Sequence, residues 1–328
     1  MPDARSIATI LIAGPTASGK SALALALARR LGGVVINADA SQVYRDLRIL
    51  SARPAPEEEA AAKHALYGHV DAAEPYAVGR WLAEAGGVIN SLRTRREAGF
   101  QQDDHRRANS LSTARLPIFV GGTGLYFEAL TSGLAVVPAI PVAVRERWRG
   151  AGGEIDLHAE LARRDPVMAA RLRPSDPQRL MRALEVIDAT GRSLADWQRE
   201  TAPGPVDPAS ALRIALAPDR GSLDARIAAR LEAMLRDGAR EEAERLVARG
   251  LDPALPALKA LGVAPLAAWA RGEIDRATAV ERTRLDTRRY AKRQSTWLRN
   301  RMADWLHVAP EAALDAAHAE IERRGVAG

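Results

Sequence analysis

Residues 7–28 decide the fold, and they read IATILIAGPTASGKSALALALA. An apolar run at residues 8–12 leads into a loop that fits the pattern G-x-x-x-x-G-K-[ST], whose fixed positions are Gly14, Gly19, Lys20 and Ser21. A helix-forming run of alanine and leucine follows at once. The order of strand, loop and helix is the context that this phosphate-binding motif requires. We therefore expect a P-loop that binds a di- or triphosphate.

The chemistry of this loop predicts how phosphates are held. Glycines let the backbone turn so that N–H groups converge, and the positive end of the helix dipole points into the same space. Lys20 adds a point charge, and the Ser21 hydroxyl is placed to ligate Mg²⁺. The predicted diphosphate- and nucleotide-binding residues are Gly14, Pro15, Thr16, Ala17, Ser18, Gly19, Lys20 and Ser21.

Composition limits the class of protein. The chain has 328 residues, enough for about two domains, with 47% hydrophobic and 27% charged residues. It contains no cysteine, which excludes disulfides and thiolate metal sites and suits a reducing cytoplasm. We see neither a signal-like start nor an apolar run long enough to span a membrane. The formal net charge of +6 favours an anionic partner.

A second strand is expected at Val34–Asn37, before a polar turn. Asp39 would then lie at the carboxyl end of that strand, beside the P-loop, where open α/β sheets place their chemistry. Position alone leaves two readings open for Asp39, a functional carboxylate and a helix cap or turn residue.

Residues 116–127 (LPIFVGGTGLYF) repeat the order of buried strand, glycine-rich turn and helix. Thr123 places a hydroxyl at the mouth of that turn. This strand, at residues 117–120, runs into glycines, and a later strand at 211–217 runs into Pro218. Neither ends in the acid that a motor-type NTPase uses to hold Mg²⁺ and water, so a group transferase fits better.

The organisation of the chain predicts an α/β protein with a P-loop NTPase-like parallel-sheet core, an inserted helical subdomain and a helical C-terminal region. Strand signals are absent from the middle of the chain, where proline and glycine separate short helical stretches. The expected parts are the first part of the core, the helical insertion, the core completion with basic helices, and an accessory helix and tail, at residues 1–137, 138–205, 206–310 and 311–328.

Two helices carry one-sided basic charge. In the insertion, Arg179 and Arg182 lie three residues apart on one helix face. Near the C-terminus, the helix expected at residues 281–301 has eight Lys or Arg from Arg282 to Arg301 against one acid in that span. A polyanionic partner explains this excess better than a merely solvated surface does.

Three classes of function remain open at this point. The first is a transferase that acts on RNA. The second is a small-molecule kinase, in which Asp39 would take a proton from an acceptor hydroxyl and the glycines near Thr123 would shape the acceptor pocket. The third is a non-enzymatic, nucleotide-dependent RNA-binding protein. The kinase hypothesis does not explain the basic helices, and the binding-protein hypothesis gives Asp39 no function.

Six segments in the same order resemble the tRNA dimethylallyltransferases, also called tRNA isopentenyltransferases. They extend to about residue 310, and the third follows a histidine-containing stretch. The segments are GPTASGKS at 14–21, NADASQVYRDL at 37–47, DAAEPY at 71–76, LPIFVGGTGLYF at 116–127, DPQRLMRALEV at 176–186 and YAKRQSTWLR at 290–299.

The resemblance implies transfer of a dimethylallyl group from dimethylallyl diphosphate to the exocyclic amine of the adenosine 3′ to the anticodon, with Mg²⁺ as cofactor. It implies that Asp39 is the general base and that Thr123 acts at the reaction channel. It also implies that backbone amides of residues 16–21 hold the pyrophosphate. The implied tRNA-binding residues are Asp39, Ala40, Ser41, Gln42, Thr123, Arg145, Gln178, Arg179, Leu180, Met181 and Arg182.

Several positions depart from the family pattern. Ala40 replaces a usual serine, and LSARP at residues 50–54 replaces a common GTAKP. Ala264 lies where the frequent GYR motif has its arginine. We expect other cations to cover that contact, and the phosphate or RNA contacts considered are Arg53, Lys292 and Arg293.

The resemblance also implies the partners. These are the tRNA anticodon stem-loop and dimethylallyl diphosphate, bound by a cytoplasmic monomer without membrane contact. Enzymes that prenylate free adenine nucleotides are the nearest alternative, followed by a P-loop small-molecule kinase. Residues 99–115 are polar and are expected to form a flexible surface insertion.

Overall fold

The computed structural model describes residues 5–102, 115–150 and 155–327, which form two units. The core unit comprises residues 1–131 and 205–328, and the helical unit is Ser132–Gly204. The core unit holds one six-stranded sheet in the order β3-β2-β4-β1-β5-β6, with every neighbouring pair parallel. The strands are β1 Thr9–Ala13, β2 Val34–Asn37, β3 Lys63–Ala65, β4 Pro117–Gly121, β5 Ala211–Leu216 and β6 Leu306–Val308.

The central strands are apolar because helices cover both of their faces. β1, β2 and β4 are buried along their whole length. In the register of the sheet, Ile10 lies opposite Ile118 on one side and Leu212 on the other. The strands expected at Val34–Asn37, 117–120 and 211–217 are therefore confirmed, to within one residue at their ends.

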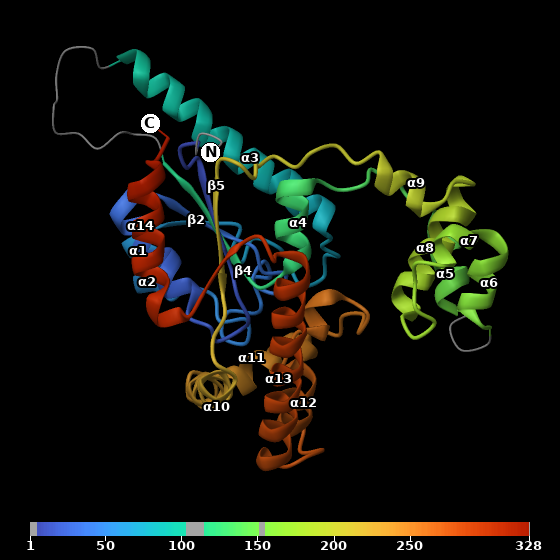
Figure 1. The fold of residues 1–328 in the computed structure, drawn as a ribbon. Helices are drawn as coiled ribbons and strands as arrows, with labels where there is room; N and C mark the ends of the chain where they lie inside the picture. Colours follow the sequence, from blue (N-terminus) through green and yellow to red (C-terminus); the bar gives the residue numbers. More distant parts are fainter. Residues whose placement is uncertain (1–4, 103–114, 151–154, 328) are drawn as a thin grey trace. The chain divides into compact units, whose positions relative to one another are not determined.

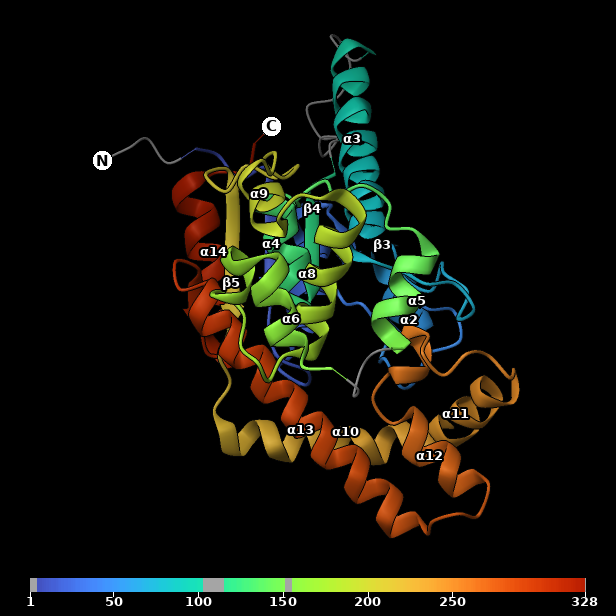
Figure 2. The same ribbon diagram turned by 90° about the vertical axis from the view of Figure 1, so that its right-hand side faces the viewer.

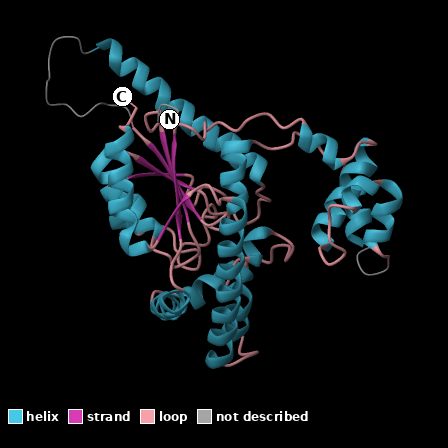
Figure 3. Ribbon diagram, viewed as in Figure 1, coloured by secondary structure: helices cyan, strands magenta, loops and turns pink. Residues whose placement is uncertain are grey.

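Helices form a layer on each face of the sheet (Figures 1 and 3). α1 and α14 cover one face, whereas α3, α4 and the C-terminal part of α13 cover the other. α10, α11, α12 and the first part of α13 gather beyond the carboxyl ends of the strands (Figures 1 and 2). The helices are α1 Lys20–Leu31, α2 Pro56–Ala61, α3 Val78–Gln102, α4 Gly124–Ser132, α10 Arg220–Arg236, α11 Ala239–Ala248, α12 Val263–Ala270, α13 Arg276–Arg301 and α14 Ala313–Arg324, with short 3₁₀ turns η1 Pro256–Lys259 and η2 Pro310–Ala312.

The helical unit is a small bundle with its own apolar core, which is built around Trp148, Leu161 and Leu184. Asp176 caps α8 by accepting the N–H of Arg179 at 3.2 Å, as its position before proline leads one to expect. The helices are α5 Val142–Gly150, α6 Leu157–Arg164, α7 Pro166–Ala169, α8 Pro177–Thr190 and α9 Leu194–Arg199.

The C-terminal segment, expected to be an accessory helix and tail, is instead part of the core. Ala313 and Ala317 of α14 are buried against the sheet. After the helix, the N–H of Ile7 donates to the Gly325 carbonyl at 2.8 Å. Small alanine side chains allow this close packing, which a count of hydrophobic residues does not reveal.

Helix boundaries differ from expectation in two further places. The apolar stretch at residues 255–269 would suit one helix by its spacing, but it is divided at Gly262, whose φ of 85° separates η1 from α12. α3 continues to Gln102, so the expected insertion at residues 99–115 begins as helix; residues 103–114 lie outside the described part. Among the helices that the structure describes, we find none both long and apolar enough to cross a membrane.

We predict that Arg324→Ala lowers the free energy of unfolding by about 2–3 kcal/mol. The Arg324 guanidinium donates to the carbonyl oxygens of Arg5, Ala209 and Ala211, and all three lose a charged donor. Arg323→Ala is the matched control, because that exposed side chain pairs only at the surface with Glu320. Urea titration measures both variants, and equal stability of the two would contradict the prediction.

Candidate active site

The P-loop joins β1 to α1 and turns where its glycines predict. Gly19 precedes α1 with a φ of 87°, and Ala17 adopts a φ of 62°. The Lys20 side chain is buried, and its Nζ donates to the Pro15 carbonyl oxygen at 3.3 Å. Burial lowers the pKa of Lys20 to about 8; the Asp39 carboxylate opposes this shift and Arg230 adds to it. A diphosphate bound at this loop would favour the charged form again.

Two backbone N–H groups among residues 16–21 already donate hydrogen bonds within the protein. The Thr16 N–H donates to Oε1 of Gln294 at 2.9 Å, and the Ser18 N–H donates to the Pro15 carbonyl at 3.2 Å. The assignment of the amides of residues 16–21 to pyrophosphate stays a prediction, and these two amides would have to exchange their partners to take part in it. The sequence of the loop could not indicate the bond from Thr16, because its partner Gln294 lies 278 positions away.

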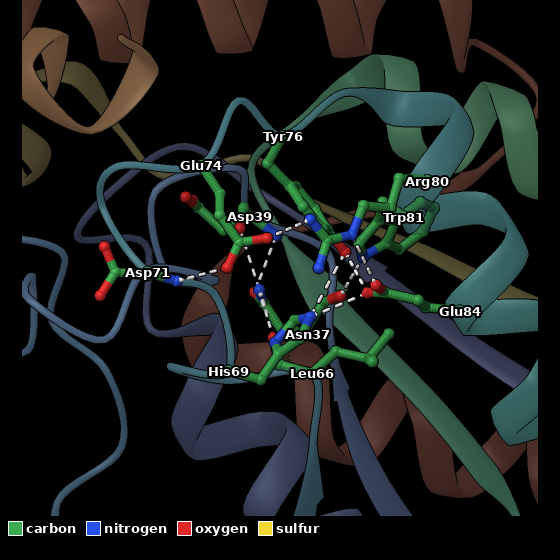
Figure 4. A network of polar contacts seen from close by, with 10 residues as sticks. All are labelled: Asn37, Asp39, Leu66, His69, Asp71, Glu74, Tyr76, Arg80, Trp81 and Glu84. Atoms are coloured by element: carbon green, nitrogen blue, oxygen red, sulfur yellow. Dashed lines mark hydrogen bonds and ion pairs between the residues drawn. The ribbon is translucent and has the colours of Figure 1, made fainter. Parts of the chain in front are cut away.

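Asp39 follows β2 and is held by its neighbours (Figure 4). The Asn37 side chain accepts the Asp39 N–H at 2.8 Å and donates to the Asp39 and Leu66 carbonyls at 2.9 and 3.0 Å. Ser41 donates to Oδ1 of Asp39 from its N–H at 3.0 Å and from its hydroxyl at 2.6 Å. These bonds hold the Asp39 carboxylate in one fixed direction.

A second hydrogen-bond network connects α3 to the segment that carries Asp39 (Figure 4). Glu84 of α3 accepts from the Tyr76 hydroxyl at 2.5 Å and lies 2.8 Å from Nε2 of His69. Trp81 of the same helix donates its indole N–H to the Asn37 carbonyl at 2.9 Å. His69, the histidine before DAAEPY, is thus tied to α3 through Glu84.

The turn after β4 lies directly against the Asp39 loop. The Thr123 hydroxyl accepts the Ala40 N–H at 3.0 Å, and the Thr123 N–H donates to the Ala38 carbonyl at 3.2 Å. Gly121 has to be glycine here, since a Cβ atom would lie 2.0 Å from the Ala38 carbonyl oxygen. The loops that carry Asp39 and Thr123 therefore meet beyond the carboxyl ends of β2 and β4.

A cavity of about 310 Å³ opens between the P-loop, the Asp39 loop and the helices beyond the sheet edge. Its polar lining includes Thr16, Asp39 and Tyr290, and its apolar lining comes from several elements. Burial and the Asp39 charge raise the pKa of Tyr290, so its hydroxyl stays protonated. The apolar residues are Ala17, Ala40, Leu50, Ile227, Leu231, Met234, Pro256, Ala260 and Leu261. A charged head and a short apolar tail would both find a matching surface here.

The sequence reasoning missed Arg230, which lines this cavity from α10. Its guanidinium donates to Oγ1 of Thr16 at 3.3 Å. Burial lowers the pKa of Arg230, and the Asp39 charge opposes that shift. A signal was present, because Arg230 shares a helix face with Ile227 and Met234, where an apolar residue is expected. Arg293, which was considered for the missing GYR arginine, also lines the cavity, together with Lys259.

Three residues that were predicted to contact RNA or phosphate pack their side chains within the protein. Gln42 is buried and donates to the Ser51 and Ala52 carbonyls at 2.9 Å each. Leu180 is 1% exposed and packs in the core of the helical unit, so its side chain is not available to RNA. Arg53 packs against Gly68, where a Cβ would lie 2.0 Å from Nη1, and is not among the residues that line the cavity.

The remaining RNA-contact candidates lie on surfaces. Ala40 is exposed and Ser41 half-buried beside Asp39. In the helical unit, Met181 packs partly against the core. The RNA-contact candidates that are exposed in that unit are Arg145, Gln178, Arg179 and Arg182.

The basic excess of α13 is smaller than its local sequence indicates. Acids from other elements approach it, since Asp224 of α10 pairs with Arg288 at 2.7 Å and Glu128 of α4 lies 3.9 Å from Arg301. Lys292 remains exposed on the outer side. Tertiary neighbours of this kind cannot be read from the helix alone.

Comparisons with known proteins agree with this geometry. A family model described as IPP transferase matches residues 42–301, and one described as isopentenyl transferase matches residues 7–67. A tRNA dimethylallyltransferase from Bradyrhizobium sp. (strain ORS 278) is 53% identical over 93% of this chain and 94% of its own length. One from Methylocella silvestris is 51% identical over 94% and 97%.

Solved structures share the fold. A tRNA isopentenylpyrophosphate transferase from Bacillus halodurans superposes with a TM-score of 0.66 at 28% identity, covering 96% of both chains. A eukaryotic dimethylallyltransferase acting on tRNA gives a TM-score of 0.78 at 24% identity, covering 98% of this chain and 81% of that one. From its motifs, its site and these relatives, the chain belongs to the tRNA dimethylallyltransferase family.

Proposed function

We propose that this protein transfers the dimethylallyl group of dimethylallyl diphosphate to the exocyclic N6 amine of the adenosine 3′ to the anticodon in tRNA. The observation that carries the proposal is the cavity that P-loop residues and Asp39 line together. Incubation with an anticodon stem-loop and the labelled donor tests it, with AMP as the competing acceptor. Label in the stem-loop is expected, and label in AMP alone would contradict the proposal.

The donor side of the cavity suits a diphosphate. Arg230 lines the cavity, and Lys20 is buried in the P-loop that borders it; burial disfavours the charge and lowers the pKa of both groups. An incoming diphosphate would relieve this cost and take the two cations as partners. As the C–O bond breaks, the same two charges would stabilise the pyrophosphate that leaves.

A divalent metal such as Mg²⁺ fits the donor side. No group of three His, Cys, Asp or Glu side chains that could hold a metal alone is found in residues 5–102, 115–150 and 155–327. Mg²⁺ commonly binds through few protein oxygens, together with phosphate oxygens and water. Ser21, exposed in the first turn of α1, would contribute its hydroxyl. When bound, the metal would neutralise charge on the leaving group.

On the acceptor side, the amine nitrogen attacks the allylic carbon and must lose a proton as the new C–N bond forms. Asp39 is the carboxylate that lines the cavity, and its Oδ1 is oriented by Ser41. We infer that Asp39 accepts this proton, which an ionised carboxylate within hydrogen-bond reach can do. The adenine has to leave its stack to enter, and contacts to the RNA offset that cost.

Asp39→Asn should lower kcat by about 10²-fold or more, because it keeps the oxygen that Ser41 binds but removes the base. Single-turnover transfer to a stem-loop measures the rate, and filter binding measures RNA affinity, which should stay near the wild-type value. Undiminished transfer would remove Asp39 from the role of base.

Arg182→Ala should weaken binding of the anticodon stem-loop and reduce the slope of log affinity against log salt by about 1, the signature of one lost phosphate contact. Arg323→Ala, which changes the net charge equally on α14, is the control. A defect confined to pyrophosphate binding would instead assign Arg182 to the donor.

Affinity for inorganic pyrophosphate should fall as the pH rises through about 8, because Lys20 loses its charge there in the free protein. Below that pH the ammonium is present and binds the anion. Calorimetry between pH 6.5 and 9 measures the effect. Lys20→Met is the control. Pyrophosphate itself titrates in the same way with both proteins, but the variant has no ammonium at position 20 to lose. Equal pH profiles of affinity for the two proteins would contradict the prediction.

A further inference from the structure

Gln294 is a buried side chain that connects two loops of the candidate site. It lies on α13 and is 6% exposed. Its Oε1 accepts from the Thr16 N–H of the P-loop, and its Nε2 donates to the Gly122 carbonyl after β4, both at 2.9 Å. Only one orientation of the amide satisfies both partners, because one atom must accept and the other must donate.

The side-chain amide of Gln294 is closely packed. A Cβ atom on Gly122 would lie 2.0 Å from Nε2 of Gln294, so the glycine permits the close approach. α13 is anchored on both sides of the contact, since Ala291 and Leu298 are buried. The helix therefore holds the amide as a rigid spacer between the two loops.

A chain of contacts extends from this spacer to both proposed reactants. On one side Arg230 donates to Oγ1 of Thr16, next to the amide that Gln294 binds. On the other, Thr123 follows Gly122 and accepts the Ala40 N–H from the Asp39 loop. One side chain thus relates the loop that would hold the donor to the turn that supports the base.

We propose that Gln294 is a positioning residue that sets the separation between the bound diphosphate and Asp39. The inference rests on the proposed function. A leucine could fill the same space without a buried amide, so packing alone does not account for the two hydrogen bonds. Because small displacements of reacting groups cost large factors in rate, loss of the spacer should affect the chemical step more than donor binding.

Two variants test this from opposite sides. Gln294→Leu removes both hydrogen bonds, whereas Gly122→Ala leaves the glutamine in the sequence but pushes its amide away. Each should lower kcat about 10-fold or more, while KM for dimethylallyl diphosphate changes by less than about threefold. Ser295→Ala is the control, because that hydroxyl bonds only back to Ala291 on the same helix.

Gln294→Glu separates the two bonds. A carboxylate still accepts from Thr16 but cannot donate to Gly122, so this variant should match the kcat loss of Gly122→Ala. Hydrogen exchange provides a readout besides activity: amides of the P-loop and of the β4 turn should both exchange about 10-fold faster in Gln294→Leu. Unchanged exchange would overturn the spacer role even if activity fell.

The outcomes also separate this inference from the proposed function. If the wild-type protein prenylates the stem-loop and the variants do so at the same kcat, the function stands and the positioning role is wrong. If the loss is confined to KM for the donor, Gln294 belongs to the diphosphate site and the inference is overturned. If the wild-type protein transfers nothing, both fail.

Discussion

The candidate site is organised around three charged groups, namely the two buried cations Lys20 and Arg230 and the carboxylate of Asp39, whose charge acts on both. Burial alone would favour loss of charge from the two basic groups, and the Asp39 carboxylate opposes that loss. Three different elements supply these charges: the first turn of α1, the loop after β2, and α10. The parallel sheet brings them together because the carboxyl ends of all its strands meet at one edge. A cavity bordered by these charges suits an anionic head group.

Around this centre, buried polar side chains fix the loops by hydrogen bonds to their backbone groups. Asn37 fixes the turn that carries Asp39, and Glu242 accepts the N–H groups of Arg48, Ile49 and Leu50, which secures the next loop from α11. These polar side chains are buried, and each satisfies groups that would otherwise be orphaned. The resulting rigidity suits a reaction in which two substrates must meet at one point.

Much of this could be predicted from the sequence, because local signals and motif order carry it. The pattern from Gly14 to Ser21 indicated the loop, and the run Val34–Asn37 placed Asp39 at a strand end. What the sequence did not reveal depends on tertiary contacts. Arg230 stands out in the sequence only as a charge on the apolar face of its helix, and its contact with Thr16 is known only from the fold. Gln294 likewise acquires its role only from Thr16 and Gly122. The motif that contains Leu180 lists neighbouring residues without showing which of them face inward, and burial of the Leu180 side chain is seen only in the fold.

The most direct measurement is a crystal structure with an unreactive, sulfur-bridged analogue of dimethylallyl diphosphate. It tests whether one cavity presents the donor to the base. The account predicts that the diphosphate contacts Lys20 and Arg230 and that the allylic carbon lies on the side of the cavity where Asp39 is exposed. A diphosphate bound away from the P-loop, or an allylic carbon directed away from Asp39, would contradict it.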